Sequence, residues 1–88
     1  MRDNNKLDVS HGAVIGTLEI ISQRGTYVDG KLILGELDRK RIIYKSNIFD
    51  EMVAARLLEP PKIPKTSKNK LYTMTEAGEE LLEKEKSS

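Results

Sequence analysis

Residues 57–80, LLEPPKIPKTSKNKLYTMTEAGEE, decide the fold of this chain. An apolar start, a proline- and lysine-rich middle and a return to apolar residues at Leu71 predict two short strands around a long polar tip, which is a hairpin. A helix follows, because Thr75 can act as an N-cap and glutamates stand in the first turn after it. A strict capping-box spacing falls instead on Thr73 and Glu76, so two starting points for this helix remain open.

Length and composition describe one small folded domain. The chain has 88 residues, of which 38% are hydrophobic and 33% charged, as in folded rather than disordered proteins. It has no cysteine and a single histidine, which excludes disulfides and a thiolate metal site. No catalytic constellation or cofactor motif is recognisable, so we expect no enzyme and no cofactor. No apolar run approaches the ~20 residues of a membrane span and no signal peptide is recognisable, so we expect a cytoplasmic protein.

The charge is polarised along the chain, although the net charge is only +1. Residues 39–70 hold nine basic and three acidic side chains, whereas residues 1–38 have a balance of −2 and residues 71–88 a balance of −3. A basic central third is the pattern expected of a surface that binds phosphates.

The first half of the domain is predicted to start with a helix and a strand. Residues 1–9 are polar and are expected to form a disordered tail before a single domain over residues 10–88. Ser10 is the predicted N-cap of a helix that ends at Gly25. The β-branched and aromatic residues 26–28 then predict a very short strand.

Two further helices are predicted before the hairpin. The first covers residues 29–41 with Asp29 as N-cap, and the second covers residues 46–58 with Ser46 as N-cap. The second must end before Pro60, because proline lacks an N–H and restricts the residue before it.

Residues 71–78, LYTMTEAG, resemble the junction between wing and helix in winged-helix transcriptional regulators of the MarR and PadR types. The resemblance covers about residues 10–86 and implies an α+β winged helix-turn-helix fold, with a three-helix core, a short strand, a β-hairpin wing and a C-terminal helix. Two features depart from the family: the connection between the second and third helices is longer and more charged, and Arg56 stands where the family tends to have glycine.

The same resemblance implies a sequence-specific regulator that binds double-stranded DNA. The third helix would present its N-terminal turn to the major groove, and the lysine-rich wing would lie on the backbone or in the minor groove. The implied contact residues are Arg39, Lys40, Arg41, Tyr44, Lys45, Ser46, Asn47, Lys62, Lys65, Lys68 and Lys70.

Two acids complicate that interpretation and keep a second function class open. Asp50 and Glu51 share the exposed face of the third helix and would repel phosphate, unless they accept a hydrogen bond from cytosine or pair with the basic residues 39–41. The alternative is a winged-helix module that binds another protein, or a subunit of a larger assembly, without direct DNA readout.

Assembly and core are predicted from the remaining apolar residues. We expect a homodimer built from the first and last helices. Its proposed contact residues are Gly12, Val14, Ile15, Gly16, Leu18 and Ile21 in the first helix and Ala77, Leu81 and Leu82 in the last. For the two glycines, simple tolerance near a helix start is the alternative. Tyr27 and Tyr72 are expected to fill the core.

Overall fold

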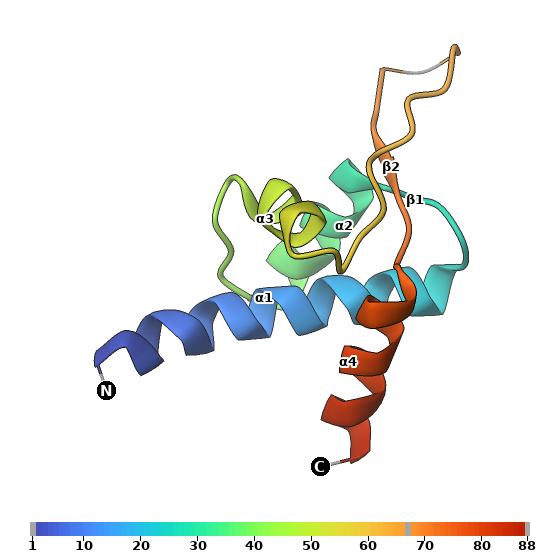
Figure 1. Ribbon diagram of the computed structural model, residues 1–88. Helices are drawn as coiled ribbons and strands as arrows, with labels where there is room; N and C mark the ends of the chain where they lie inside the picture. The colour runs from blue at the N-terminus through green and yellow to red at the C-terminus, as the bar shows by residue number, and fades with distance from the viewer. Residues whose placement is uncertain (1, 67, 88) are drawn as a thin grey trace.

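The chain forms a small α+β fold, seen in a computed structural model that describes residues 2–66 and 68–87, and residues 2–10 by their backbone only (Figure 1). Within these residues, four helices accompany a two-stranded antiparallel sheet. Along the chain the elements are α1 (Arg2–Arg24), β1 (Val28–Asp29), α2 (Gly30–Arg39), α3 (Ile48–Ala54), β2 (Leu71–Tyr72) and α4 (Glu76–Ser87). None of the described helices is both long and apolar enough to cross a bilayer.

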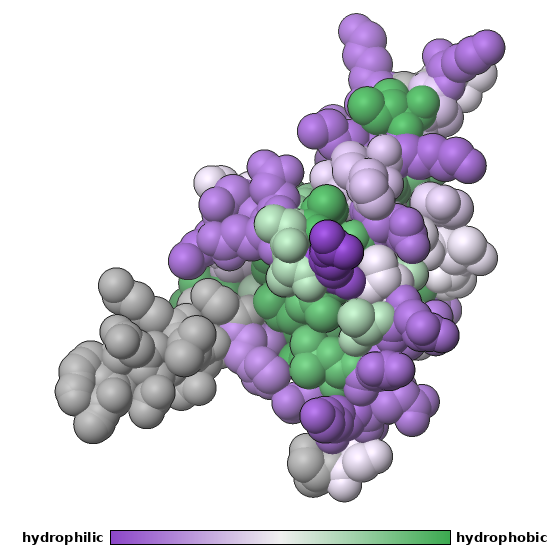
Figure 2. Space-filling view, viewed as in Figure 1, coloured by the Kyte–Doolittle hydropathy of each residue, from purple (hydrophilic) through white to green (hydrophobic). Residues whose placement is uncertain are grey.

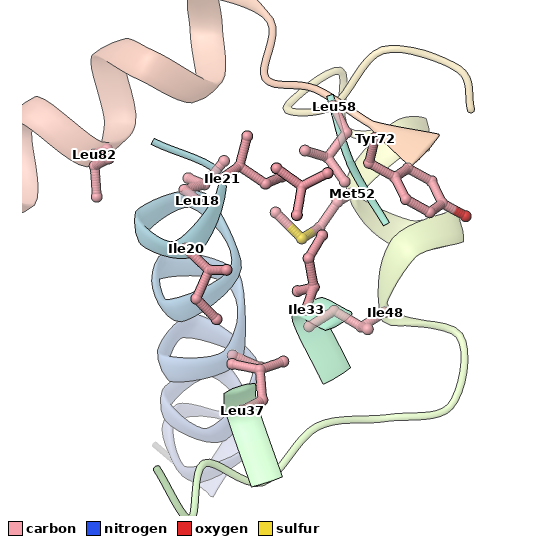
Figure 3. Packing of buried hydrophobic residues seen from close by; sticks show 12 residues of the cluster. Leu18, Ile20, Ile21, Ile33, Leu37, Ile48, Met52, Leu58, Tyr72 and Leu82 are labelled. Carbon is pink, nitrogen blue, oxygen red and sulfur yellow. The ribbon is translucent and has the colours of Figure 1, made fainter. Parts of the chain in front are cut away.

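The core lies where α1 meets α2, α3 and α4. In the view of Figure 1, α2 and α3 sit above α1, α4 descends below it, and the hairpin rises away from the body. Figure 3 shows side chains of α1 facing those of α2 and α3 around Met52, with Leu58 from the start of the hairpin beside it. The buried hydrophobic residues are Ala13, Leu18, Ile20, Ile21, Val28, Ile33, Leu37, Ile48, Met52, Leu58, Tyr72 and Leu82.

Helix α1 is longer than predicted. It begins at Arg2 and not after Ser10, so the backbone of residues 2–9 is helical where a disordered tail was expected. No proline or glycine occurs before Gly12. A helix that is anchored by its packed half can therefore add these residues at one hydrogen bond per residue.

Helices α2 and α3 are shorter than predicted, and both end in the same motif. After α2, Arg41 has a φ of 61° and the Ile42 N–H donates to the Leu37 carbonyl at 2.9 Å. After α3, Arg56 has a φ of 64° and the Leu57 N–H donates to Met52 at 2.9 Å. This is a Schellman C-cap, which places a left-handed residue just past the helix. Glycine, which was noted as typical of winged-helix regulators at position 56, would adopt this conformation without strain.

The start of α3 also differs from the prediction. Asn47 occupies the N-cap position and makes no side-chain capping bond, while Ser46, the predicted cap, lies in the preceding turn. In contrast, Asp29 caps α2 as predicted, because its carboxylate accepts a hydrogen bond from the Lys31 N–H at 2.8 Å.

The predicted hairpin is present, and its returning arm, β2, pairs on both sides. One neighbour is β1, in which Val28 pairs with Tyr72. Of the predicted strand residues 26–28, only Val28 belongs to β1. The other neighbour is the outgoing arm of the hairpin, through the bridges Leu58–Met74 and Lys62–Leu71. Leu58 to Lys62 is four steps along the chain and Leu71 to Met74 is three, so the outgoing arm has one extra residue. The prolines at 60 and 61 lie in this bulge, where no ladder N–H is needed.

The junction from β2 into α4 is fixed to the end of α3. Thr75 is the N-cap, since its hydroxyl accepts from the Gly78 N–H at 3.1 Å while donating to the Arg56 carbonyl. The Thr75 N–H also donates to the Leu57 carbonyl at 3.1 Å. Of the two predicted starting points, the structure has the one at Thr75 and not the capping box at Thr73.

Part of the surface assigned to a homodimer is used inside the chain. Leu18 and Ile21 are fully buried, and Leu82 of α4 packs in the same core. Gly16 is buried too, and a Cβ at this position would lie 3.0 Å from side-chain atoms of both Leu37 and Ile42. Gly16, Leu18, Ile21 and Leu82 are therefore not available to a second copy, because α4 packs on α1 of its own chain. Gly12 and Ala77 are exposed, so a homodimer through the rest of these helices stays a prediction.

Candidate nucleic-acid interface

Asp29 joins the hairpin to the start of α2. One carboxylate oxygen accepts the Lys31 N–H, and the other accepts the side-chain amide of Asn69 at 2.8 Å. The Gly30 N–H donates to the Lys70 carbonyl at 2.9 Å. These bonds fix the returning arm of the hairpin against α2, so the base of the hairpin has a defined direction.

An aromatic pair joins α3 to the same sheet. The rings of Phe49 and Tyr72 stack with centroids 4.4 Å apart and an interplanar angle of 29°. Gly30 permits this approach, because a Cβ there would lie 3.1 Å from the Tyr72 ring and 3.2 Å from the Phe49 ring. Burial, and then the nearby charge of Asp50, raise the pKa of Tyr72 above its usual value. The helix predicted to read DNA is thus held rigidly beside the hairpin.

The hairpin carries four of the predicted contact lysines. The Lys62 ammonium lies 5.0 Å from the centroid of the Tyr27 ring, a cation–π contact. Tyr27 is therefore not a core residue as predicted; it is 43% exposed, whereas Tyr72 is buried as predicted. Lys65, Lys68 and Lys70 are exposed, and none of them forms an ion pair with any described residue. Ser67, at the centre of the predicted wing tip, lies outside the described residues.

At the start of α3, the predicted contact residues turn toward an acid. The Lys45 ammonium lies 3.8 Å from a carboxylate oxygen of Glu51, and the Asn47 side-chain amide donates to the same oxygen at 3.4 Å. Glu51 therefore pairs with residues just before its own helix. It does not pair with the basic residues 39–41, which was one of the two predicted ways to offset its charge. Ser46 is exposed.

The end of α2 contributes less free positive charge than predicted. The Arg39 guanidinium lies 3.8 Å from Glu36, which also accepts a 2.9 Å bond from Arg24. Tyr44 packs against the core, and its burial and a hydrogen bond to Asp38 raise its pKa. Tyr44 is thus half-buried, and its hydroxyl already has a partner in Asp38.

Lys40 and Arg41 are the remaining predicted contact residues. Both are exposed, and neither forms an ion pair among the described residues. In the view of Figure 1, the connection that carries them and the tip of the hairpin lie on either side of α3, both above α1. The predicted residues that form no ion pair therefore include two separate basic segments, one at the end of α2 and one on the hairpin.

One exposed residue on the hairpin was missed by the sequence reasoning. Ile63 is 60% exposed, next to Lys62 and Pro64. The sequence did contain a signal, because Ile63 is the only aliphatic side chain apart from proline within residues 60–70. Figure 2 shows hydrophobic surface near the far end of the hairpin with hydrophilic side chains around it.

Comparison of the chain with protein-family models, with curated proteins and with solved structures finds no match. Among the described residues, no three His, Asp or Glu side chains are grouped so as to hold a metal ion.

Proposed function

We propose that this chain is a winged-helix protein that binds double-stranded DNA and acts as a transcriptional regulator. Its hairpin is the wing, and α2 and α3 are the two helices of the helix-turn-helix. The wing supplies most of the affinity through backbone phosphates, while the turn before α3 supplies the base contacts.

The observation that carries this proposal is the set of unpaired lysines on the hairpin. Lys65, Lys68 and Lys70 are exposed on an arm that projects from the body, and no described acid neutralises them (Figure 1). A lysine that already pairs with a carboxylate gains little from a phosphate, whereas an unpaired one releases a condensed counterion from DNA when it binds. The fixed base of the hairpin further supports the proposal, since a contact arm of defined direction loses less entropy on binding.

The contribution of α3 is expected to be smaller. Its first turn carries Asp50 and Glu51, and Glu51 holds Lys45 and Asn47. Base readout by Asn47 therefore requires that its 3.4 Å bond to Glu51 be exchanged for a bond to a base. We expect weak sequence preference beside a strong dependence of affinity on salt.

A pair of matched double variants tests the proposal. Lys65→Ala/Lys68→Ala removes two charges from the hairpin, and Lys84→Ala/Lys86→Ala removes two from the exposed end of α4. Titration of fluorescent duplex DNA at several salt concentrations should show that the first variant reduces the slope of log K against log salt by up to about 0.9 per lost contact. The second should leave the slope unchanged. Equal slopes for both variants and the wild type would remove the hairpin from the interface.

A second candidate function is a module that binds another protein through α3. It is favoured by the exposed acids Asp50 and Glu51, and by Ile43 in the preceding connection, which is 72% exposed. An acidic helix face beside an exposed isoleucine suits a basic protein partner better than a phosphate backbone.

Neutralising Glu51 distinguishes the two candidates. If α3 faces DNA, Glu51→Gln should strengthen duplex binding, because it removes a repulsive charge and the ion pair that holds Lys45, and weakens the bond to Asn47. Glu80→Gln, on the exposed face of α4, is the control for the change in net charge. Duplex affinity that responds equally to both substitutions would place α3 outside the DNA interface and favour the protein-binding candidate.

A further inference from the structure

Phosphate contact by lysines does not account for Ile63. A single exposed apolar residue is common on protein surfaces and needs no explanation by itself. Ile63 differs in its position, because it follows the last paired residue of the outgoing arm, Lys62, and leads into the lysine-bearing tip. Ile63 is two residues from Lys65 in the chain, and both are exposed.

The backbone around Ile63 is restrained on both sides. The N–H groups of Lys62 and Leu71 each donate to the carbonyl of the other, at 2.9 and 2.8 Å. Pro64 follows, and a residue before proline is confined to extended conformations. The isoleucine side chain is therefore presented from a stiff extended arm rather than from a flexible loop, where it would collapse onto the body.

We propose that Ile63 is an apolar wedge that enters the minor groove and partly separates a base step, while the lysines beside it hold the flanking phosphates. Proteins that bend DNA from the minor groove use such wedges, including isoleucine and proline, with basic residues nearby. The inference rests on the proposed DNA binding and extends it: the protein kinks the duplex and prefers sequences that kink easily.

The surface fits a duplex better than a membrane. A lone isoleucine offers less apolar surface than one myristoyl chain, which by itself binds bilayers only marginally. The contact of Lys62 with the Tyr27 ring also restrains a lysine beside Ile63, as needed for a fixed geometry against a rigid groove.

The test uses the full chain and duplexes of about 20 base pairs with a dye at each end, one with a central TA step and one with a stiff A-tract. The wild type should shorten the end-to-end distance of the TA duplex and bind it more tightly than the A-tract. Ile63→Ser should weaken binding to the TA duplex about tenfold and abolish both the bend and the preference. Its salt slope should stay unchanged, because no charge is lost. Ile63→Leu should retain the bend.

Ile43→Ser is the control for loss of an exposed isoleucine, since Ile43 is 72% exposed, against 60% for Ile63, and lies in a basic segment outside the hairpin. An Ile63→Ser variant that binds and bends the TA duplex like the wild type overturns the wedge, as does an equal loss in Ile43→Ser. Ile63-dependent binding to phosphatidylserine vesicles, with duplex binding unchanged, overturns it in favour of a membrane contact. The proposed DNA binding survives these outcomes if the lysine-dependent salt slope remains. A wild type that binds no duplex refutes both.

Discussion

Replacing Gly78 with alanine tests how closely α4 is packed against the end of α3. A Cβ at this position would overlap with the carbonyl oxygen of Leu57 and lie 3.3 Å from its carbonyl carbon and 3.2 Å from Leu18 Cδ2. Leu18 is a flexible side chain that can adjust, but the Leu57 carbonyl cannot. It accepts the Thr75 N–H at 3.1 Å and belongs to the residue that closes α3.

The sign of the effect follows from two opposing terms. Alanine is favoured over glycine inside a helix by about 1 kcal/mol. Overpacking against an immobile group costs about 1–3 kcal/mol, and displacing Leu57 also strains a hydrogen bond worth about 1 kcal/mol. We therefore expect Gly78→Ala to lower the free energy of unfolding by about 2 kcal/mol, which lowers the melting temperature by roughly 10 °C in a domain of this size.

Gly35→Ala in α2 is the matched control. Gly35 is exposed, and apart from its chain neighbours and the backbone of its own helix no described group lies within 4 Å of the position that its Cβ would take. Urea unfolding should show that this variant is more stable than the wild type by up to about 1 kcal/mol, with the same m-value. A Gly78→Ala variant as stable as the control would refute the close contact between α4 and Leu57, and with it the placement of the hairpin relative to α3.

Three further substitutions test individual features of the fold by the same urea unfolding assay. Arg56→Gly should raise the free energy of unfolding by roughly 1 kcal/mol, because the residue has a φ of 64°; a loss of stability would show that the arginine side chain outweighs the strain. Thr17→Val should also be stabilising by about 1 kcal/mol, because the Thr17 hydroxyl is buried and has no hydrogen-bond partner among the described residues, whereas Thr17→Ser should be destabilising. Asp29→Ala should cost about 1–2 kcal/mol through the lost cap, and should speed proteolysis of the hairpin through the lost bond to Asn69; unchanged proteolysis would contradict the anchoring role.

The parts of the fold that the sequence predicts correctly depend on short-range chemistry. Thr75 and Asp29 are caps because their side chains reach N–H groups two or three residues ahead, whatever the rest of the chain does. The prolines at 60 and 61 mark the outgoing arm because they lack an N–H, although α3 ends earlier, at Ala54. Gly78 belongs to the same short stretch, although its contact with Leu57 becomes visible only in three dimensions.

The helix ends were mispredicted because they depend on distant packing. Both C-caps place an arginine in a left-handed conformation that its side chain disfavours by about 1–2 kcal/mol. The compensation comes from the next residue: Ile42 and Leu57 both pack against the core. The local sequence around Arg41 or Arg56 does not show that these apolar contacts stabilise the chain more than another turn of helix would.

The late start of α3 also explains why the electrostatics of the candidate interface were mispredicted. Had the helix begun after Ser46, Asn47 would have been part of its first turn and would have projected with it. Because it begins at Ile48, Lys45 and Asn47 stand outside the helix and fold back onto Glu51, one turn further along. The acid that was expected to oppose DNA binding thus also occupies two of the groups that were expected to support it. The lysines on the hairpin have no acidic neighbour of this kind among the described residues. The gain in duplex affinity on Glu51→Gln therefore measures how much the pairing with Glu51 weakens DNA binding by the turn before α3.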